Sequence, residues 1–334
     1  MSNRRTSIRW IPLVAASLAL LALSACGSSA SSSASGSTQA PASQGQGKTD
    51  ASIAYVMGFG TLPIYVAQVK GYLSANGINA TLKPLTSSVT LIPGLGRQYD
   101  IIDTPPADVF NAAAKGVNIV AIAGNQQNSV SSPNSVLITK DASIKSVKDL
   151  AGKRVGLTSL TGGFYTSLLY LLKNAGVSAK SVNFVTMPYA TMGDQLAAGR
   201  VDAAISSTPY WSPLVKQGYH IVLDVNEAAN GQGSPNNLWA SSQTFVNAHP
   251  GVVTAFKKAL NQADAYIAAN PASARQLLQS YLGVTAAVAD ASPLPDLSTQ
   301  LTAASLQQCL KVAISGGQVT GKVPNIDSLI FSGQ

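Results

Sequence analysis

The chain has 334 residues with a formal net charge of +8, and only 11% of its residues are charged. No run of Lys and Arg and no interleaved aromatic strip accompanies this mild excess, so the composition excludes the usual footprint of nucleic-acid binding. Two cysteines and two histidines, Cys26, Cys309, His220 and His249, lie far apart, which leaves no disulfide framework and no metal-ligand spacing. Cys309 lies in a helical-looking stretch and is expected to be a small buried hydrophobe.

The first 25 residues have the features of a targeting segment, so they do not contribute to the fold. Three arginines precede an apolar run over 11–23, which is too short for a comfortable membrane span. Small residues then lead into Cys26, and this pattern resembles a bacterial lipobox. The resemblance implies that residues 1–25 are a lipoprotein signal peptide and that Cys26 is the lipidated N-terminus; the alternative is a plain signal peptide with an incidental cysteine. Residues 26–50 form a flexible tether, because a segment rich in Ser, Gly, Ala and Gln buries too little apolar surface to fold.

Residues 51–123 alternate apolar strands with amphipathic helices. The first strand leads through a glycine turn into a helix that begins at a proline. The next helix, expected over 87–97, is short or bent because Pro93 and two glycines interrupt it. A third helix begins at 104–106. The predicted strands of this series are 52–57, 79–85, 100–103 and 117–123.

A second series of elements begins at Lys153 and repeats the first. Helix stops and Thr-Pro dipeptides recur at matching places, about a hundred residues apart. Strands that alternate with helices in two copies predict two α/β lobes of similar topology, each with a mostly parallel sheet covered on both faces. The predicted elements are strands at 154–157, 182–187, 201–205 and 219–225, helices at 164–174 and 191–198, and a helix opened by 207–209.

Two short strands are expected to be the crossings between the lobes, and three helices then complete the first lobe. The crossings are 136–139 and 238–241, and the helices are 250–269, 271–282 and 298–312. The chain is therefore divided into two lobes, which are lobe 1 (51–137, completed by 242–334) and lobe 2 (138–241).

Open α/β sheets bind ligands outside the carboxyl ends of their strands. Two facing lobes would bring four turns to one cleft, at 58–62, 103–106, 158–163 and 206–211. Each turn precedes a helix N-terminus, where backbone N–H groups and partial positive charge gather. None of the turns carries Lys or Arg, so they predict a site that holds an oxyanion or a strongly polar group with neutral donors. The candidate ligand-binding residues are Gly60, Thr61, Asp103, Thr104, Ser159, Thr161, Gly162, Thr208, Tyr210 and Trp211.

Several of these residues have a second interpretation that the sequence leaves open. Thr104 and Thr208 could be helix N-caps, and Tyr210 and Trp211 could be packing residues. Asp103 could accept a hydrogen bond from a ligand or cap the following helix. The sequence has no nucleophile elbow, phosphate loop or dinucleotide fingerprint, and no obvious general base near the turns. These observations predict a protein that is not an enzyme and uses no cofactor.

Four segments carry a resemblance to a known family. Residues 146–156, Ser-Val-Lys-Asp-Leu-Ala-Gly-Lys-Arg-Val-Gly, look like the common entry to the second lobe of solute-binding proteins. The Asp-Thr-Pro-Pro of 103–106 before an Ala-rich helix, and the prolines of 249–253 and 270–271, are similar to the aliphatic sulfonate, nitrate and taurine branch. With the lipobox and tether, the chain resembles the solute-binding lipoproteins of ABC importers over about residues 51–282. The resemblance implies a type II periplasmic-binding-protein-like fold, with two α/β lobes, a ligand cleft and a two-strand hinge.

The same resemblance implies an extracytoplasmic component that captures a small anionic or polar solute by hinge closure and delivers it to a permease. An aliphatic sulfonate, taurine or nitrate is the expected solute, and the permease and ATPase subunits are the expected partners. The protein is expected to be a monomer that the lipid on Cys26 anchors to the extracytoplasmic face of the cell membrane. Two alternatives stay open: a thiamine-precursor-like pyrimidine or another heterocycle as the ligand, and a surface enzyme or sensor on the same fold.

Overall fold

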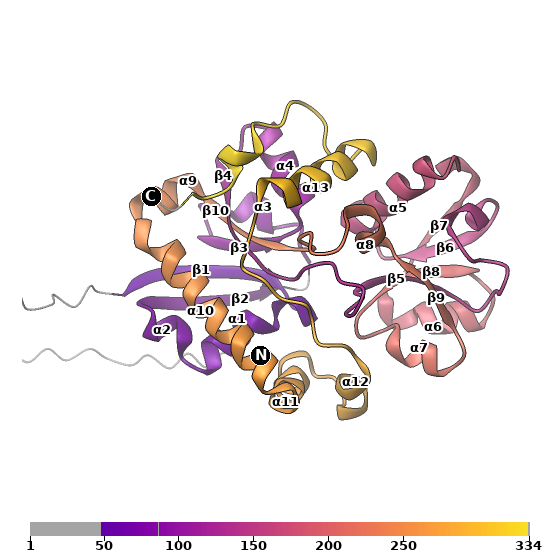
Figure 1. Cartoon of the computed structure of the whole chain (residues 1–334), viewed down its shortest axis with the longest axis horizontal. Helices are drawn as coiled ribbons and strands as arrows, with labels where there is room; N and C mark the ends of the chain where they lie inside the picture. The colour runs from indigo at the N-terminus through magenta and orange to yellow at the C-terminus, as the bar shows by residue number, and fades with distance from the viewer. Residues whose placement is uncertain (1–47, 86, 333–334) are drawn as a thin grey trace, which may run out of the picture. The chain divides into compact units, whose positions relative to one another are not determined.

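The computed structural model describes residues 48–85 and 87–332 (Figure 1). The predicted signal peptide, the predicted lipidation site Cys26 and nearly all of the predicted tether lie outside these residues. Among the described helices, none combines the length and the apolar character that crossing a membrane requires.

Two five-stranded sheets have the same strand order and the same strand directions, which confirms the duplication seen in the sequence. In each sheet the first three strands are parallel, and the fourth runs antiparallel to both of its neighbours. The first sheet has the order β2 (Ile78–Leu85), β1 (Thr49–Val56), β3 (Ile101–Thr104), β10 (Leu238–Ser242) and β4 (Ile119–Gly124). The second has the order β7 (Asn183–Thr186), β6 (Arg154–Leu157), β8 (Ala203–Ser207), β5 (Ser135–Thr139) and β9 (His220–Asp224).

Even an irregularity is repeated between the two sheets. The pairing of β10 with β4 slips by one residue between Trp239 and Ala240, and that of β5 with β9 slips between Leu137 and Ile138. These positions are equivalent in the two strand orders, so each copy carries the same β-bulge.

The strands β5 and β10 correct one expectation. Both were expected to cross between the lobes, and each instead lies inside a sheet, β5 in the second and β10 in the first. The reason is that both strands are buried, and a buried strand needs hydrogen-bond partners for its backbone on both sides. The segments that run between the sheets are therefore 125–134 and 225–237. We propose to count β5 with lobe 2 and β10 with lobe 1, which moves the predicted lobe boundaries from 137 and 241 to these segments.

Helices cover both faces of each sheet. The first half contributes α1 (Leu62–Val69), α2 (Tyr72–Ala75), α3 (Leu91–Gly94) and α4 (Pro106–Ala114), and the second contributes α5 (Gly163–Asn174), α6 (Tyr189–Ala197), α7 (Ser212–Lys216) and α8 (Val225–Asn230). The C-terminal part contributes α9 (Gln243–Ala248), α10 (Pro250–Ala269), α11 (Pro271–Leu282), α12 (Ala286–Ala291) and α13 (Ala303–Ser315). Short 3-10 turns are η1 (Phe59–Thr61), η2 (Val147–Leu150), η3 (Ala179–Ser181) and η4 (Ile326–Leu329).

Most predicted helices are present with small shifts. The helices predicted at 250–269 and 271–282 are confirmed as α10 and α11, and the short helix expected in 87–97 is the four-residue α3, which contains Pro93. The helix predicted to open at 207–209 begins only at Ser212, because 208–211 form a turn.

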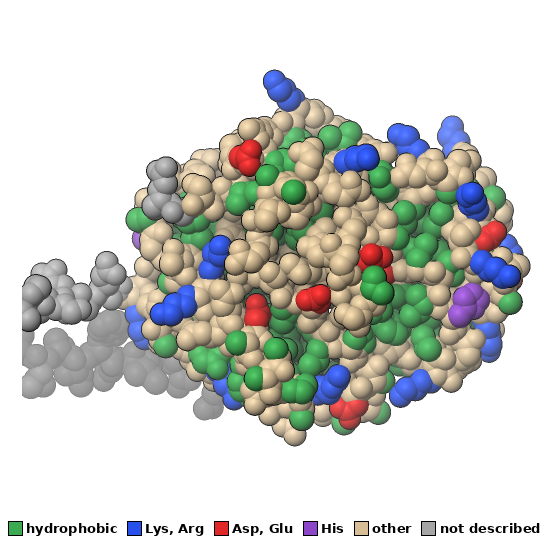
Figure 2. Space-filling model, viewed as in Figure 1, with side chains coloured by type: hydrophobic (Ala, Val, Ile, Leu, Met, Phe, Trp, Pro, Cys, Tyr) green, Lys and Arg blue, Asp and Glu red, His purple; other side chains and the backbone are tan. Residues whose placement is uncertain are grey.

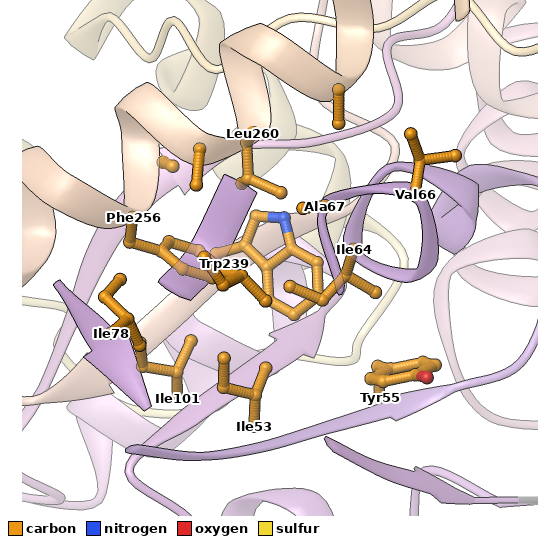
Figure 3. Packing of buried hydrophobic residues seen from close by; sticks show 14 of the residues in the cluster. Ile53, Tyr55, Ile64, Val66, Ala67, Ile78, Ile101, Trp239, Phe256 and Leu260 are labelled. Atoms are coloured by element: carbon orange, nitrogen blue, oxygen red, sulfur yellow. The ribbon is translucent and has the colours of Figure 1, made fainter. Parts of the chain in front are cut away.

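The alternation of side chains along each strand decides which core they enter. In lobe 1, Ile53 and Trp239 face α1 and α10, while Ala54 and Ile102 face α4 and α13. Figure 3 shows Trp239 between the sheet and α10, and its ring meets the Phe256 ring edge to face at 5.3 Å. The C-terminal helices thus return to the first sheet and complete its two cores. Lobe 2 repeats this arrangement, with α5 and α8 on one face and α6 and α7 on the other.

Candidate functional site

The first turn of lobe 1 follows β1, and its two predicted residues are packed against the chain. Thr61 is 3% exposed; its hydroxyl accepts a hydrogen bond from the Gly58 N–H at 3.0 Å and lies 2.8 Å from the hydroxyl of Tyr281. Gly60 lies against the side chain of Gln126, which a Cβ atom at this position would overlap. Thr61 therefore fixes the turn to α11, and Gly60 allows a connecting segment to approach it.

Asp103, at the carboxyl end of β3, lies between the two connecting segments. Its carboxylate oxygens accept one hydrogen bond from Asn125 Nδ2 at 2.8 Å and one from Asn237 Nδ2 at 2.7 Å. Burial raises the pKa of Asp103 to about 7, and the two amides act in the opposite direction. Asp103 thus ties the beginning of one connecting segment and the end of the other to the first sheet.

Thr104 is buried beside Asp103, and it is not a helix cap. Its hydroxyl donates to the carboxylate of Asp108 at 3.4 Å, whereas the cap position of α4 belongs to Pro105 and has no side-chain hydrogen bond. Burial raises the pKa of Asp108, although hydrogen bonds from Gln318 and Thr104 favour its charged form. Both carboxyl groups on the lobe 1 side of the site are therefore hydrogen-bonded within the chain.

The turn after β6 in lobe 2 is more open. Ser159 and Thr161 are exposed, and their hydroxyl oxygens lie 2.9 Å apart. Gly162 precedes α5 with a φ of 86°, a conformation that favours glycine. These three residues leave hydroxyl groups and the start of α5 accessible to a solute.

The turn after β8 contains one packing aromatic and one open aromatic. The indole N–H of Trp211 donates to Thr208 Oγ1 at 3.0 Å, and Trp211 packs in the lobe 2 core, so the packing interpretation holds for it. Tyr210 is 45% exposed and stacks on Tyr189, with ring centroids 5.4 Å apart and planes inclined by 18°. Burial raises the pKa of Tyr189 to about 12, and its hydroxyl is hydrogen-bonded to Thr158. One ring of the pair is therefore held in place while the other stays open to solvent.

A small cavity lies where the beginnings of α4 and α5 approach each other. It has a volume of about 30 Å³, which suits one or two water molecules, and none of its lining residues is charged. Pro105 and Pro106 line it from lobe 1, and Gly163 and Thr166 line it from lobe 2. Two of the four predicted turns are thus brought together here, through the residues directly after Thr104 and Gly162. The turns at 58–62 and 206–211 contribute no lining residue to this cavity.

The sequence interpretation missed the amide side chains of the cavity. They belong to Asn226, Asn230, Asn236 and Gln318. Ser167 of α5 donates to Asn226 at 2.7 Å, and Asn226 donates to Asn236 at 2.7 Å, which joins lobe 2 to a connecting segment. The many Asn residues of 226–237 could have indicated polar side chains at the site, but a segment rich in Asn and Gly is equally typical of a linker.

Basic side chains are not concentrated at the site. Lys and Arg lie scattered over the face shown in Figure 2. Within residues 48–85 and 87–332, no three His, Cys, Asp or Glu side chains lie close enough together to hold a metal ion. The described turns therefore offer hydroxyls, amides, helix N-termini and an aromatic ring to a solute.

Comparison with known proteins agrees with this organisation. A family model described as NMT1/THI5 like matches residues 59–274. The chain belongs to the NMT1/THI5-like family. This NMT1/THI5-like chain is 27% identical over 225 residues to a putative thiamine biosynthesis protein of Haemophilus influenzae, an alignment that covers 65% of this chain and 68% of the relative. It is also 30% identical over 139 residues to the taurine-binding periplasmic protein of Escherichia coli, which covers 41% of this chain and 42% of the relative.

Solved structures share the fold of this NMT1/THI5-like protein. The periplasmic aliphatic sulphonate binding protein SsuA of Escherichia coli has a TM-score of 0.70 and 19% identity, over 84% of this chain and 97% of SsuA. The periplasmic nitrate-binding protein NrtA of Synechocystis has a TM-score of 0.65 and 15% identity, over 85% and 86% of the two chains. The expected periplasmic-binding-protein-like fold with two α/β lobes is thereby confirmed.

Proposed function

We propose that the protein is the solute-binding component of an ABC importer and that it traps a small solute between its two lobes. The observation that carries this proposal is the meeting of one strand-to-helix turn from each of two duplicated sheets, with 125–134 and 225–237 as the only two chain segments that connect the sheets in the described part of the chain. Two lobes on two connections can close like a hinge around a solute. The protein would act as a receptor and not as an enzyme.

The first solute class is a small anionic or polar molecule such as an aliphatic sulfonate, taurine or nitrate. The beginning of α5 supplies backbone N–H groups, the beginnings of α4 and α5 both supply partial positive charge, and Ser159 and Thr161 supply hydroxyls. The structural neighbours named for sulphonate and nitrate support this class. Asp103 and Asp108 oppose a purely anionic solute, which favours the zwitterion taurine within the class.

The second solute class is a planar heterocycle, such as a thiamine-precursor-like pyrimidine. Tyr210 carries this candidate, because its exposed ring is backed by Tyr189 and offers a flat surface for stacking. Neutral amides and hydroxyls suit the edges of an uncharged ring. The relative named for thiamine biosynthesis agrees with this class.

We propose that the ten candidate residues divide into two groups. Ser159, Thr161, Gly162 and Tyr210 contact the solute, because they are the open residues of lobe 2 or border the cavity. The others shape the walls of the site from buried or half-buried positions; they are Gly60, Thr61, Asp103, Thr104, Thr208 and Trp211.

We also propose the membrane context. The chain would be a monomer on the extracytoplasmic side, held at the cell membrane by the lipid on Cys26, and it would deliver its solute to permease and ATPase subunits. The lipobox-like pattern before Cys26 and the periplasmic relatives support this part of the proposal.

A thermal-shift panel tests the proposal directly. The full chain would be melted with taurine, ethanesulfonate, nitrate and 4-amino-5-hydroxymethyl-2-methylpyrimidine, each over a concentration series. A solute present at a hundred times its dissociation constant stabilises the folded state by about 2.7 kcal/mol. A shift with taurine or ethanesulfonate selects the first class, and a shift with the pyrimidine selects the second. If no small solute shifts the melting temperature and the protein turns over a substrate, the receptor proposal is wrong.

A further inference from the structure

Gln318 joins the two lobes through both ends of its side-chain amide. Its Oε1 accepts a hydrogen bond from Thr166 Oγ1 at 2.7 Å, and its Nε2 donates to Asp108 Oδ1 at 2.8 Å. Thr166 lies in the first turns of α5 in lobe 2, and Asp108 lies in the first turn of α4 in lobe 1. An amide has one accepting and one donating end, so Gln318 can make both bonds in this order, which a carboxylate with two accepting oxygens could not do.

The backbone of Gln318 is fixed to lobe 1. Its N–H donates to the carbonyl of Ala313 at 3.0 Å, at the C-terminal end of α13, and the next residue, Val319, is buried in a lobe 1 core. Gly316 allows this segment to lie against α5, because a Cβ there would come within 2.7 Å of the Thr166 carbonyl oxygen. The backbone of Gln318 therefore stays with lobe 1, and its side chain reaches across to lobe 2.

Thr166 can release this bond without leaving its hydroxyl unpaired. The carbonyl oxygen of Gly162 lies 2.8 Å from Thr166 Oγ1, and the hydroxyl has a single proton, which only one acceptor can bind fully. Loss of Gln318 would direct that proton to Gly162 within α5. Opening of the lobes thus breaks the bond between Thr166 and Gln318 at a small cost in free energy, because the Thr166 hydroxyl keeps an acceptor. The contact can therefore form and break reversibly.

α13 extends the contact away from the cavity. Its Leu306 and Ala313 pack into lobe 1, whereas Val312 packs against Tyr170 of α5 and Ala229 of α8. Gln308 of the same helix donates to the carbonyl of Ala229 at 2.8 Å. α13 is therefore attached to lobe 1 by one face and touches lobe 2 with another, with Gln318 just beyond its C-terminal end.

We propose that Gln318 is a positioning residue that latches lobe 2 to lobe 1 and so sets the affinity for solute through the open–closed equilibrium. The inference rests on the proposed function, in which closure of the lobes traps the solute. Loss of one net hydrogen bond changes such an equilibrium by roughly fivefold, and the apparent affinity follows the fraction of closed protein. A residue that acted only as a solute contact would leave the solute-free protein unchanged.

The test compares solute-free proteins first. Small-angle X-ray scattering and hydrogen exchange would be measured on the full-length wild type, Gln318→Ala, Thr166→Val and the double variant, with the exposed α13 residue Gln307→Ala as the matched control. The latch predicts a larger radius of gyration and faster exchange at 163–170 for Gln318→Ala, no change for Gln307→Ala, and no further change when Thr166→Val is added.

The solute arm separates this inference from the proposed function. The member of the solute panel that stabilises the wild type should bind Gln318→Ala about fivefold more weakly, with the same bound radius of gyration. If wild type and Gln318→Ala have identical solute-free scattering and exchange, the latch is wrong even when the solute compacts both proteins. If no panel member compacts the wild type, the proposed function fails, while the solute-free comparison still decides whether Gln318 joins the lobes.

Discussion

The carboxylate of Asp103 accepts a hydrogen bond from the amide of Asn237 at 2.7 Å, although the two residues lie 134 positions apart. The other carboxylate oxygen accepts from Asn125, so one buried group holds both connecting segments where they meet lobe 1. Asp224 does the same for lobe 2: it accepts from the N–H groups of Asn134 at 2.7 Å and Asn226 at 2.9 Å. Each end of the hinge is thus fastened to its sheet by one aspartate.

Replacement of Asp103 by Asn should lower the free energy of unfolding by about 1–2 kcal/mol. An amide has one accepting end, so either Asn125 or Asn237 would face an N–H₂ group and lose its partner. Urea denaturation at pH 7 measures the change. Asp290→Asn, at an exposed position on α12, is the matched control and should leave the unfolding midpoint in place. Equal midpoints for Asp103→Asn and wild type would show that the amides find other partners.

The stability of the wild type should fall as the pH rises from about 4 to about 7. Burial raises the pKa of both Asp103 and Asp264 from 3.8 to about 7, so in this window the folded state binds protons that the unfolded state has released. This contribution is fully present below pH 3.8 and is lost as the pH rises through 7. Urea unfolding at several pH values measures it, and Asp103→Asn should flatten the slope. A free energy of unfolding that increases from pH 4 to pH 7 would contradict the raised pKa values of Asp103 and Asp264.

Two half-buried carboxylates limit the stability of the folded state at acid pH. Hydrogen bonds from Lys153 and Ser143 lower the pKa of Asp141, and those from Arg154 lower the pKa of Asp202. The stability that these groups contribute is present above their unfolded pKa of 3.8 and is lost as the pH falls further. Maximum stability is therefore expected near pH 4–5.

The sequence predicted the fold well because its signals are local and regular. Apolar runs bounded by glycines predicted β1, β6 and their partners, and helix-opening prolines predicted α10 and α11 at their observed bounds. The sequence did not predict α8 and α12. α8 lies in a segment rich in Asn and Gly, and its start depends on a cap from Asp224, which the sequence pattern did not distinguish from the end of a strand.

The site was predicted only in part, because its geometry depends on contacts between distant segments. Patterns within the chain located the edge of each sheet correctly, so every candidate residue lies at or just beyond a strand's carboxyl end. No local pattern shows that Thr61 bonds to Tyr281, or that Gln318 reaches Asp108 over 210 positions. The role of a polar side chain was therefore less predictable than its position.

Tyr210 should decide between the two solute classes. Tyr210→Ala removes the exposed ring, so the affinity for 4-amino-5-hydroxymethyl-2-methylpyrimidine should fall about three- to tenfold if this heterocycle stacks there. Tyr210→Phe keeps the ring and should retain the affinity, which makes it the matched control. Calorimetric titration with the pyrimidine and with taurine measures both. A loss that is the same for both ligands would mean that Tyr210 shapes the site and does not select a heterocycle.

Gly124, the last residue of β4, is packed too closely against the backbone to accept a side chain without strain. A Cβ at this position would overlap the Ser298 carbonyl oxygen and come within 2.7 Å of that of Gln300, and both atoms belong to the backbone. The Gly124 N–H also donates to the carbonyl of Thr299 at 2.9 Å, which holds the segment leading to α13 against the sheet.

Gly124→Ala should therefore lower the free energy of unfolding by about 1–3 kcal/mol, since neither backbone can move away without losing this hydrogen bond. For a chain of this size each kcal/mol lowers the melting temperature by about 1.5–2 °C, which differential scanning calorimetry resolves. Gly251→Ala is the matched control, because nothing lies within 4 Å of a Cβ there and the residue is in the first turn of α10. Displacement of 298–300 also shifts the start of α13, so Gly124→Ala should speed hydrogen exchange at 303–318 as well. If exchange at 303–318 stays slow while the melting temperature falls, the strain is confined to residues that precede α13. The contact between Gly124 and 298–300 then has no influence on the latch at Gln318.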